Sequence, residues 1–327
     1  MVNNWLITGG CGFIGSSLIK RIITDNSKAN IRILDNLTVG SRSDLSEVCE
    51  FKEVSEKSIE RSPEGVELLV GDICDEGTCL KAGQGVDVIV HLAANTGVGP
   101  SIEDPRGDCV TNVIGTFNML EAARKGKVKR FVFASSGAPV GECEPPIHEE
   151  LAPHPVSPYG ASKLAGEGYC SAYHRSFGVG TVALRFGNVY GPRSKHKSSV
   201  IAKFIKQALS GEFLEVYGDG NQTRDFIYID DLVNAISIAV SKADIGGEIF
   251  QIATNTETTV NDIMDRLLMV LKEKNISEVE VVNSERRLGD VVRNFSDTSK
   301  AEEILGWKAV MSLNKGIEAT VDYFSAG

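Results

Sequence analysis

Short apolar runs alternate with helical patterns through the first two-thirds of the chain, and a helix from Phe13 to Thr24 follows the first run. Because the runs are apolar nearly throughout, they predict strands that are buried on both faces. Their alternation with helices predicts a parallel, doubly wound sheet. The predicted strands are Trp5–Thr8, Ile31–Leu34, Val66–Val70, Val86–Val90, Arg130–Phe133 and Thr181–Leu184.

Two regions depart from this rhythm. Residues 41–63 are polar and charged, which indicates a helix and loops inserted at the surface. Beyond about Pro192 helices dominate, and we expect them at 200–209, 230–241, 260–274 and 313–324, with short strands between. The fold class we predict is α/β. A doubly wound domain takes residues 1–190 and a smaller mixed α/β substrate-binding lobe takes mostly 191–327, with more than one crossing of the chain allowed.

Composition narrows the classes of function. The chain has 327 residues, of which 42% are hydrophobic and 24% charged, as in ordinary globular proteins. Its net charge of −10 argues against a nucleic-acid partner, and the basic cluster Arg193–Lys197 is either a local anion site or a solvated loop. No run of 18 apolar residues occurs, so we expect no membrane span, and without a targeting segment we expect a cytoplasmic protein.

The cysteines do not indicate a metal centre. Seven are scattered along the chain, without a C-x-x-C pair and without histidines at zinc spacing. We expect reduced, mostly structural thiols and no metal.

A glycine-rich turn follows the first predicted strand. Gly9, Gly12 and Gly15 form G-x-x-G-x-x-G directly before a helix, where they allow a tight turn, a close approach of a pyrophosphate and close packing of helix on strand. The helix N-terminus then offers its N–H groups to the phosphates. Asp35, twenty residues after Gly15, ends the second strand and suits the ribose hydroxyls. Because a carboxylate repels a 2′-phosphate, a Rossmann-type site for NAD is favoured over one for NADP.

Two more strand ends extend this predicted site. Asp72 follows the third strand, where its carboxylate faces the adenine amino group, and small residues follow His91 where the backbone passes the cofactor. His91 itself lies in an apolar run, so we interpret it as a packed structural histidine. The residues expected to contact NAD are Gly9, Gly12, Phe13, Ile14, Gly15, Asp35, Asn36, Asp72, Ile73, Leu92, Ala93, Ala94, Tyr159 and Lys163.

A tyrosine and a lysine one helical turn apart are the candidate reactive pair. Tyr159 and Lys163 share a helix face, and Ser135 and Ser136 end the strand before them. We expect the ammonium to lower the pKa of the phenol, so that phenolate removes a hydroxyl proton as hydride leaves the same carbon. The predicted catalytic residues are Ser136, Tyr159 and Lys163; the alternative is an exposed helix face without function.

Together these residues resemble the extended short-chain dehydrogenase/reductase family. The resemblance continues through the segments Leu184–Arg193, Gly218–Phe226 and Arg287–Asp290, which look like that family's nucleotide-sugar segments. It therefore covers nearly the whole chain. It implies a homodimer that pairs through two helices of each subunit.

The resemblance also implies a substrate site. Asn188, Arg224 and Arg287 would meet the pyrophosphate of a UDP-sugar, with Asp290 near the ribose, and arginine forks suit phosphate oxygens. A firmly held diphosphate leaves the sugar free to turn. The residues expected to contact the substrate are Ser135, Ser136, Asn188, Val200, Tyr217, Arg224, Arg287, Asp290 and Asn294.

The type of reaction is inferred from acidic residues that some members of the family carry and that this chain lacks. Family members that are 4,6-dehydratases carry an Asp-Glu pair after the strand-end hydroxyl residue, whereas residues 137–141 here contain no acid. The resemblance thus implies a 4-epimerase that uses tightly bound NAD and passes through a 4-keto sugar. Asn294, where relatives limited to plain hexoses carry tyrosine, favours UDP-GlcNAc and UDP-GalNAc, with UDP-Glc and UDP-Gal also possible.

Several alternatives stay open. Thr96 stands where standard UDP-galactose 4-epimerases carry lysine, which argues against a strict UDP-galactose enzyme. A UDP-glucuronate 4-epimerase also has a small residue at the position of Asn294. A net reductase, a dehydratase and a non-catalytic dinucleotide sensor complete the list.

Overall fold

The computed structural model describes all residues except 1, 60, 198, 277–278, 286–291 and 327. The chain forms two compact units. The first contains residues 1–142, 149–185 and 233–250, and the second contains residues 143–148, 186–232 and 251–327. The chain therefore passes between the two units more than once.

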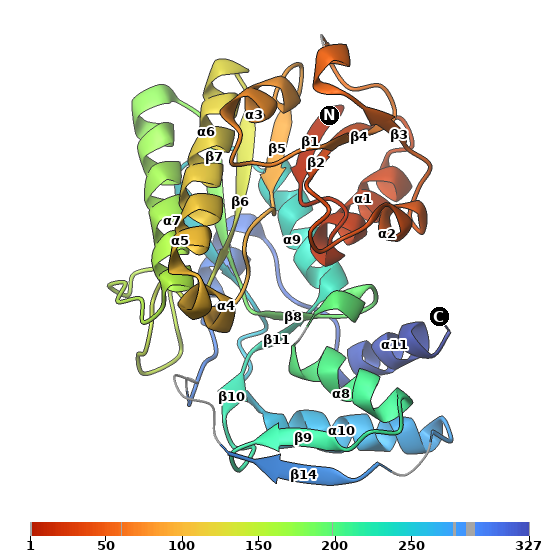
Figure 1. Ribbon diagram of the computed structural model, residues 1–327. Coiled ribbons are helices and arrows are strands. Elements are labelled where there is room, and N and C mark those ends of the chain that lie inside the picture. Colours follow the sequence, from red (N-terminus) through yellow and green to blue (C-terminus); the bar gives the residue numbers. More distant parts are fainter. Residues whose placement is uncertain (1, 60, 198, 277–278, 286–291, 327) are drawn as a thin grey trace. The chain divides into compact units, whose positions relative to one another are not determined.

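The main element of the first unit is an eight-stranded sheet (Figure 1). The pairs β6–β5, β5–β1, β1–β2 and β2–β4 are parallel, as the apolar runs predict, and the pair β4–β3 is parallel too. In spatial order the strands are β12 (Glu248–Ile252), β7 (Thr181–Phe186), β6 (Arg130–Ser136), β5 (Val88–His91), β1 (Asn4–Thr8), β2 (Asn30–Asp35), β4 (Val66–Val70) and β3 (Lys52–Val54).

The centre of this sheet is buried on both faces. Leu6 and Ile7 are neighbours on β1 and point to opposite faces, yet both are fully buried, and Ile31 on β2 is too. Every predicted strand is present. β5 begins two residues later than expected, at Val88, and continues to His91.

The polar stretch 41–63 contains a strand as well as the expected helix and loops. Its helix is α2 (Arg42–Ser46), followed by β3 and the 3₁₀ turn η1 (Glu56–Ser58). β3 lies at the edge of the sheet, beside β4, with Lys52 and Glu53 exposed. Charged side chains are typical of edge strands, because they discourage pairing with another chain. The same charges hid the strand from a prediction based on apolar runs.

Helices cover the faces of the sheet. α3, α6 and α7 pack together and share one apolar core, in which Met119, Phe131 and Tyr173 lie. In Figure 1, α5, α6 and α7 stand on one side of the sheet and α1 on the other. The helices are α1 (Phe13–Asp25), α3 (Glu76–Ala82), α4 (Val98–Glu103), α5 (Pro105–Cys109), the π-helix η2 (Val110–Ile114), α6 (Gly115–Lys125) and α7 (Pro158–Phe177).

The second unit has short strands and amphipathic helices, as expected. Its strand pairs are β8 (Asn188–Tyr190) with β11 (Phe226–Tyr228), β9 (Leu214–Tyr217) with β14 (Val281–Ser284), and β10 (Thr223–Arg224) with β13 (Thr258–Thr259). Its helical elements are η3 (Ser194–His196), α8 (Val200–Leu209), α10 (Val260–Glu273), η4 (Ala301–Leu305) and α11 (Leu313–Ser325). α9 (Ile229–Ser241) begins in this unit and continues into the first. All four predicted helices are present.

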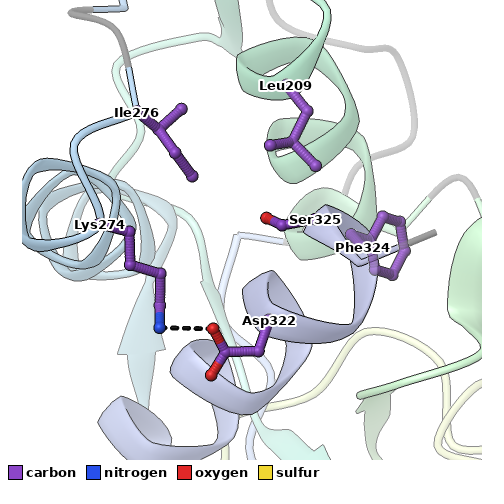
Figure 2. A pocket seen from close by; sticks show the side chains of 6 residues that line it. All are labelled: Leu209, Lys274, Ile276, Asp322, Phe324 and Ser325. Atoms are coloured by element: carbon purple, nitrogen blue, oxygen red, sulfur yellow. Dashed lines mark ion pairs between the residues drawn. The ribbon is translucent and has the colours of Figure 1, made fainter.

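Figure 2 shows a cavity of about 590 Å³ in the second unit, at the ends of α8, α10 and α11. Leu209, Ile276 and Phe324 line it together with an ion pair between Lys274 and Asp322, whose nitrogen and oxygen are 2.5 Å apart. None of the predicted substrate residues lines this cavity. In the described part of the chain no helix is both long and apolar enough to cross a membrane.

Candidate active site

The glycine turn needs glycine at its first and last positions. Gly9 has a φ of +68°, and a Cβ added there would lie 2.9 Å from the backbone nitrogen of Ala93. A Cβ on Gly15 would lie 2.3 Å from the carbonyl oxygen of Gly9. The first helix therefore approaches the turn as closely as backbone allows, which is the packing that the motif predicts.

The N-terminus of α1 follows this turn directly. Gly12 is its N-cap, and among the described residues no side chain caps this end. Phe13, Ile14 and Gly15 then form the first turn, which carries no acid. A helix end of this kind presents free N–H groups and the positive end of the dipole, which suits a pyrophosphate.

Asp35 ties the glycine turn to the second strand. One carboxylate oxygen accepts the N–H of Cys11 and the other accepts the N–H of Leu37, both at 2.9 Å. Burial raises the pKa of Asp35, while these backbone bonds act in the opposite direction. Since each oxygen has a second lone pair, the carboxylate keeps acceptor capacity for the ribose hydroxyls.

Asn36 and Asp72 come together beside it. The side-chain amide of Asn36 donates to one oxygen of Asp72 at 3.0 Å, and the N–H of Cys74 donates to the other at 2.8 Å. Partial burial raises the pKa of Asp72, but the bonds from Cys74 and Asn36 outweigh it and the net shift is downward. The side chain of Asn118 fixes the next residue, Ile73, through its carbonyl at 2.9 Å.

Thr8 holds the fourth strand end against the glycine turn. Its hydroxyl oxygen accepts the N–H groups of Leu92 and Ala93, each at 3.1 Å, so the Leu92–Ala94 segment lies beside the turn. His91 is buried and bonds Thr8 through Nδ1 at 2.8 Å and Thr116 through Nε2 at 3.1 Å. Burial, with a smaller effect of Lys163, lowers its pKa to about 3. His91 is thus a neutral, packed histidine, as the sequence predicts.

Ser136, Tyr159 and Lys163 come together at the carboxyl end of β6. Ser157 caps α7 by accepting the N–H of Gly160 at 3.1 Å, and this places Tyr159 in the first turn. The buried ammonium of Lys163 donates to the carbonyl of Ala134 at 2.9 Å and lies 5.8 Å from the centroid of the Tyr159 ring. The interpretation as an exposed helix face is therefore wrong for Lys163.

The pKa of the Tyr159 phenol lies above its ordinary value. Burial raises the pKa of Tyr159 to about 12, a hydrogen bond with Ser136 lowers it, and the charge of Asp108 raises it further. The ammonium of Lys163, which was expected to lower this pKa, lies over the face of the ring and bonds a backbone carbonyl.

Ser135 was expected to contact substrate, but its hydroxyl is engaged inside the protein. It donates to Glu167 at 2.6 Å, and Glu167 receives two bonds from Arg185, each of 2.8 Å. Both side chains of this ion pair are at most 3% exposed. Sequence reasoning missed Glu167, although it lies four residues after Lys163 and eight after Tyr159, on the same helix face.

In the second unit, three predicted substrate residues lie on neighbouring segments. Asn188 begins β8 and is paired in register with Phe226, two residues after Arg224. The N–H of Asn294 donates to the hydroxyl of Thr223, the residue before Arg224, at 3.3 Å. Asn188, Arg224 and Asn294 are therefore held on adjacent backbone.

Asp225 fixes these segments, and sequence reasoning did not single it out. Its buried carboxylate accepts the N–H and hydroxyl of Thr254 at 2.7 and 2.6 Å, and the N–H of Ser296 at 3.3 Å. Burial raises its pKa against the effect of these bonds. The sequence signal that could have identified Asp225 is its position next to Arg224, which was predicted to bind phosphate.

The remaining predicted substrate residues have different outcomes. Val200 is the first residue of α8. Tyr217 ends β9, where its hydroxyl donates to Glu215 at 2.6 Å and its ring lies 4.5 Å from the ammonium of Lys203. Arg287 and Asp290 lie outside the described residues.

Comparison with known proteins identifies the family. Residues 5–253 match the model of the "NAD dependent epimerase/dehydratase family". The chain is 37% identical to a putative UDP-glucose 4-epimerase of Methanocaldococcus jannaschii, with 97% of each chain covered. It superposes with a TM-score of 0.87 on the UDP-glucose 4-epimerase of Thermotoga maritima with UDP-glucose, at 34% identity and 99% coverage of both chains.

A further solved structure is the UDP-N-acetylglucosamine 4-epimerase of Methanobrevibacter ruminantium in complex with UDP-N-acetylmuramic acid. It has a TM-score of 0.88 and 29% identity, and the alignment covers 100% of this chain and 99% of that one. The glycine turn, the uncapped helix end and Asp35 fit a dinucleotide, in agreement with the family match. The chain belongs to the NAD dependent epimerase/dehydratase family, within the extended short-chain dehydrogenases/reductases, and its cofactor is NAD.

Proposed function

We propose that the protein is a nucleotide-sugar 4-epimerase that inverts C4 of a UDP-sugar through a 4-keto intermediate. The observation that carries this proposal is the group of Ser136, Tyr159 and Lys163 at the end of β6, followed by a segment, residues 137–141, without an acid. Oxidation and reduction at a hydroxyl-bearing carbon require the group of Ser136, Tyr159 and Lys163. Elimination of water across C5 and C6 would also require an acid and a base in the segment that follows Ser136.

In the proposed reaction Tyr159 acts as the base and then as the acid. Its phenolate takes the proton of the C4 hydroxyl while the C4 hydrogen leaves with its electron pair, and a ketone results. Bound NAD would supply the hydride acceptor and, in its oxidised form, a positive charge near the phenol. After the sugar has turned, Tyr159 returns the proton as hydride adds to the opposite face of C4. Ser136 holds the substrate oxygen and bonds the phenol.

The pKa of Tyr159 has to fall for this cycle to operate near neutral pH. The protein alone raises it to about 12, chiefly by burial. Lys163 supplies a fixed ammonium 5.8 Å from the ring centroid, and the oxidised cofactor adds a second positive charge. In the proposal, deprotonation therefore depends on cofactor binding.

Arg224, Arg287 and Asn188 would hold the diphosphate in the proposed complex, with Val200, Tyr217 and Asp290 around the nucleoside. Arginine forks grip phosphate oxygens without contacting the sugar, which leaves the ring free to turn between its two orientations. Asn294 is held next to the Arg224 segment by its bond to Thr223. A residue of this size leaves room for an N-acetyl group, so we propose UDP-GlcNAc and UDP-GalNAc as the substrate pair, with UDP-Glc and UDP-Gal second.

UDP-glucuronate is the second candidate, and a basic cluster favours it. In the described part of the chain the buried Nε of Arg193 has no hydrogen-bond partner, and neither has the hydroxyl of Ser199. Burial lowers the pKa of Lys197 between them. Unsatisfied donors near a cation are suited to an anion such as a sugar carboxylate, although the same group would also suit a phosphate.

We also propose a homodimer formed through α6 and α7. Exposed apolar side chains gather on these helices and on the adjoining α4 and η2, and aromatic rings extend the surface, with Phe117 and Tyr169 5.6 Å apart between centroids. A contiguous apolar surface of this kind marks an association site. The exposed members are Ile102, Val110, Ile114, Phe117, Tyr169 and Phe177.

Incubation with UDP-GlcNAc, UDP-Glc and UDP-GlcA separately, followed by identification of the product, tests the function. We expect conversion to the C4 epimer without net consumption of nicotinamide, and purified protein that retains its dinucleotide. A reduced or dehydrated sugar would identify a net reductase or a dehydratase. Retention of the dinucleotide without turnover of any of the three sugars would indicate a sensor.

A further inference from the structure

Tyr217 ends β9, and its side chain lies on the same face of that strand as the side chain of Glu215. The alternate residues Leu214 and Val216 are buried, whereas the other two are only partly buried. This alternation is typical of a strand with one face against a core, because successive side chains point to opposite faces. Glu215 and Tyr217 are therefore neighbours on the less buried face of β9.

The carboxylate of Glu215 accepts hydrogen bonds from α8, β9 and β14. One oxygen accepts the ammonium of Lys203 on α8 at 2.5 Å and the hydroxyl of Tyr217 at 2.6 Å. The other oxygen accepts the hydroxyl of Ser284 at 2.9 Å, and Ser284 is paired in register with Tyr217 on β14. The side chains of Lys203 and Glu215 are 24% and 26% exposed. A partly shielded ion pair within a network is held more firmly than an isolated pair on the surface.

Lys203 also restrains the ring of Tyr217. Its ammonium lies 4.5 Å from the ring centroid and 3.3 Å from the phenol oxygen. A cation at this distance is attracted to the ring face, so rotation of the ring would lose a favourable contact. The side-chain amide of Gln222 donates to the carbonyl of Tyr217 at 2.9 Å. Tyr217 is thus held at its ring, its hydroxyl and its backbone.

We propose that Lys203 and Glu215 are positioning residues that hold the Tyr217 ring in place to stack on the planar nucleobase of the substrate. This inference rests on the proposed function, in which Tyr217 lies beside the nucleoside. An aromatic ring can stack on the face of any base, and a ring that is already immobile loses less conformational freedom when the base binds. Because Glu215 binds the ammonium of Lys203, that ammonium acts on the ring and not on the diphosphate.

Binding of UDP to the holoenzyme, measured by titration calorimetry, tests this inference without requiring turnover. Lys203→Met keeps an unbranched apolar side chain and removes the ammonium. We expect it to weaken UDP binding by about 2- to 12-fold, because the Tyr217 ring then becomes ordered only when the base binds. KM for the UDP-sugar should rise by the same factor with kcat unchanged, as for an interaction made equally before and during the reaction. Lys203→Arg, which can pair with Glu215 and lie over the ring, should restore both values.

Lys274→Met is the matched control. Lys274 pairs with Asp322 at 2.5 Å and is 26% exposed, nearly the same as Lys203 in its own pair. It lines the cavity at the ends of α8, α10 and α11, which no predicted substrate residue lines. Its replacement should therefore leave the affinity for UDP at the wild-type value.

Tyr217→Ala distinguishes an effect through the ring from a direct effect on the diphosphate. If Lys203 acts through the ring, Lys203→Met should weaken UDP binding no further once the ring has been removed. A full additional loss in the double variant would show that Lys203 binds the diphosphate itself, which would overturn the proposal. Wild-type affinity in folded Lys203→Met would overturn it too, and so would an equal loss in Lys274→Met.

If Lys203→Met does not fold, the double variant Lys203→Met/Glu215→Gln serves in its place, because it leaves neither charge without its partner. Failure of both to fold would assign the ion pair to the fold alone, which also overturns the proposal. Failure of the proposed function has a different signature. Wild type would then either bind no UDP, which removes this inference as well, or bind UDP without producing the C4 epimer, whatever the result at Lys203.

Discussion

At the scale of single residues, the site combines groups that sequence patterns identify with groups that only the fold brings near. Tyr159 and Lys163 belong to the first kind, because their spacing on a helix is visible in the chain. Glu167 and Asp225 belong to the second, since each is a buried acid whose partners come from distant segments. The burial of such an acid and its hydrogen-bond partners determine whether it shifts the pKa of a site residue or only stabilises the fold around the site.

Asn294→Tyr tests the proposed preference for N-acetylated sugars. The larger ring would fill the space left for the acetamido group, whereas a plain hexose does not need it. We expect kcat/KM for UDP-GlcNAc to fall by about 10- to 200-fold, as for a lost pocket contact, with a much smaller change for UDP-Glc. Parallel measurement of both sugars with the same preparation checks this. An equal loss for the two would remove Asn294 as the selectivity residue.

His91 predicts a pH dependence of stability. Its pKa is about 3 in the folded protein, chiefly because of burial, and about 6.5 when unfolded. Between these values the unfolded state binds a proton that the folded state does not, so stability falls as the pH drops from about 6.5 towards 3. The slope approaches about 1.4 kcal/mol per pH unit. Urea unfolding at pH 7 and pH 5 should show this loss in wild type.

His91→Gln is the matching variant. It loses some of the bonds to Thr8 and Thr116 at every pH, but it has no proton to gain. We expect it to be less stable than wild type at pH 7 and to show a smaller further loss at pH 5. If the difference between the two proteins were the same at both pH values, the assignment of a depressed pKa to His91 would be incorrect.

At the scale of elements, α7 is held against two strands by one buried ion pair. Glu167 on α7 bonds Ser135 on β6 and Arg185 on β7, and the same helix presents Tyr159 and Lys163. The pair therefore orients the helix that carries the reactive residues relative to the strand that carries Ser136.

Glu167→Ala should be strongly destabilising, because it leaves Arg185 charged and buried without its partner. We expect a loss of about 3–5 kcal/mol in the free energy of unfolding, measured by urea denaturation. Asp25→Ala provides the control, since it breaks the exposed pair with Arg21 and should cost at most about 0.5 kcal/mol. A loss at Glu167 no greater than at Asp25 would show that the buried pair does not hold the helix.

Elements were predictable where the local pattern is strong. Strands such as Ile31–Leu34 and helices such as 200–209 show a clear periodicity, and both are present. The sequence did not predict β3, α4 or α5. β3 is only three residues of mixed polarity, and its pairing with β4 depends on segments outside it. The glycine turn was predictable, since its backbone conformation requires glycine. The raised pKa of Tyr159 was not, because burial by distant segments causes it.

At the scale of the whole molecule, the proposed dimer makes a direct prediction. Ile102→Glu places a charge on the exposed apolar surface of α4, next to α7, where Ile102 is 58% exposed in the single chain. We expect the variant to sediment as a monomer at concentrations where wild type is dimeric, because burial of an unpaired carboxylate opposes association. Val310→Glu is the control, since Val310 is 85% exposed and belongs to the second unit, not to α4, η2, α6 or α7.

A monomeric wild type would contradict the dimer, and so would dissociation caused equally by both variants. The change of pattern near Pro192 predicts a second lobe in the C-terminal part of the chain. The assignment of residues 143–148 to the second unit and of 233–250 to the first depends on tertiary contacts that no local composition reveals.

The most direct test of the central claim compares wild type with Tyr159→Phe on UDP-GlcNAc, with the configuration at C4 followed by proton NMR. Wild type should interconvert the two epimers, and Tyr159→Phe should be slower by about 100- to 10,000-fold, because the proton carrier is gone. Tyr169→Phe, on the same helix but partly exposed, should retain wild-type turnover. Unchanged turnover in Tyr159→Phe, or a wild-type product other than the C4 epimer, would contradict the account.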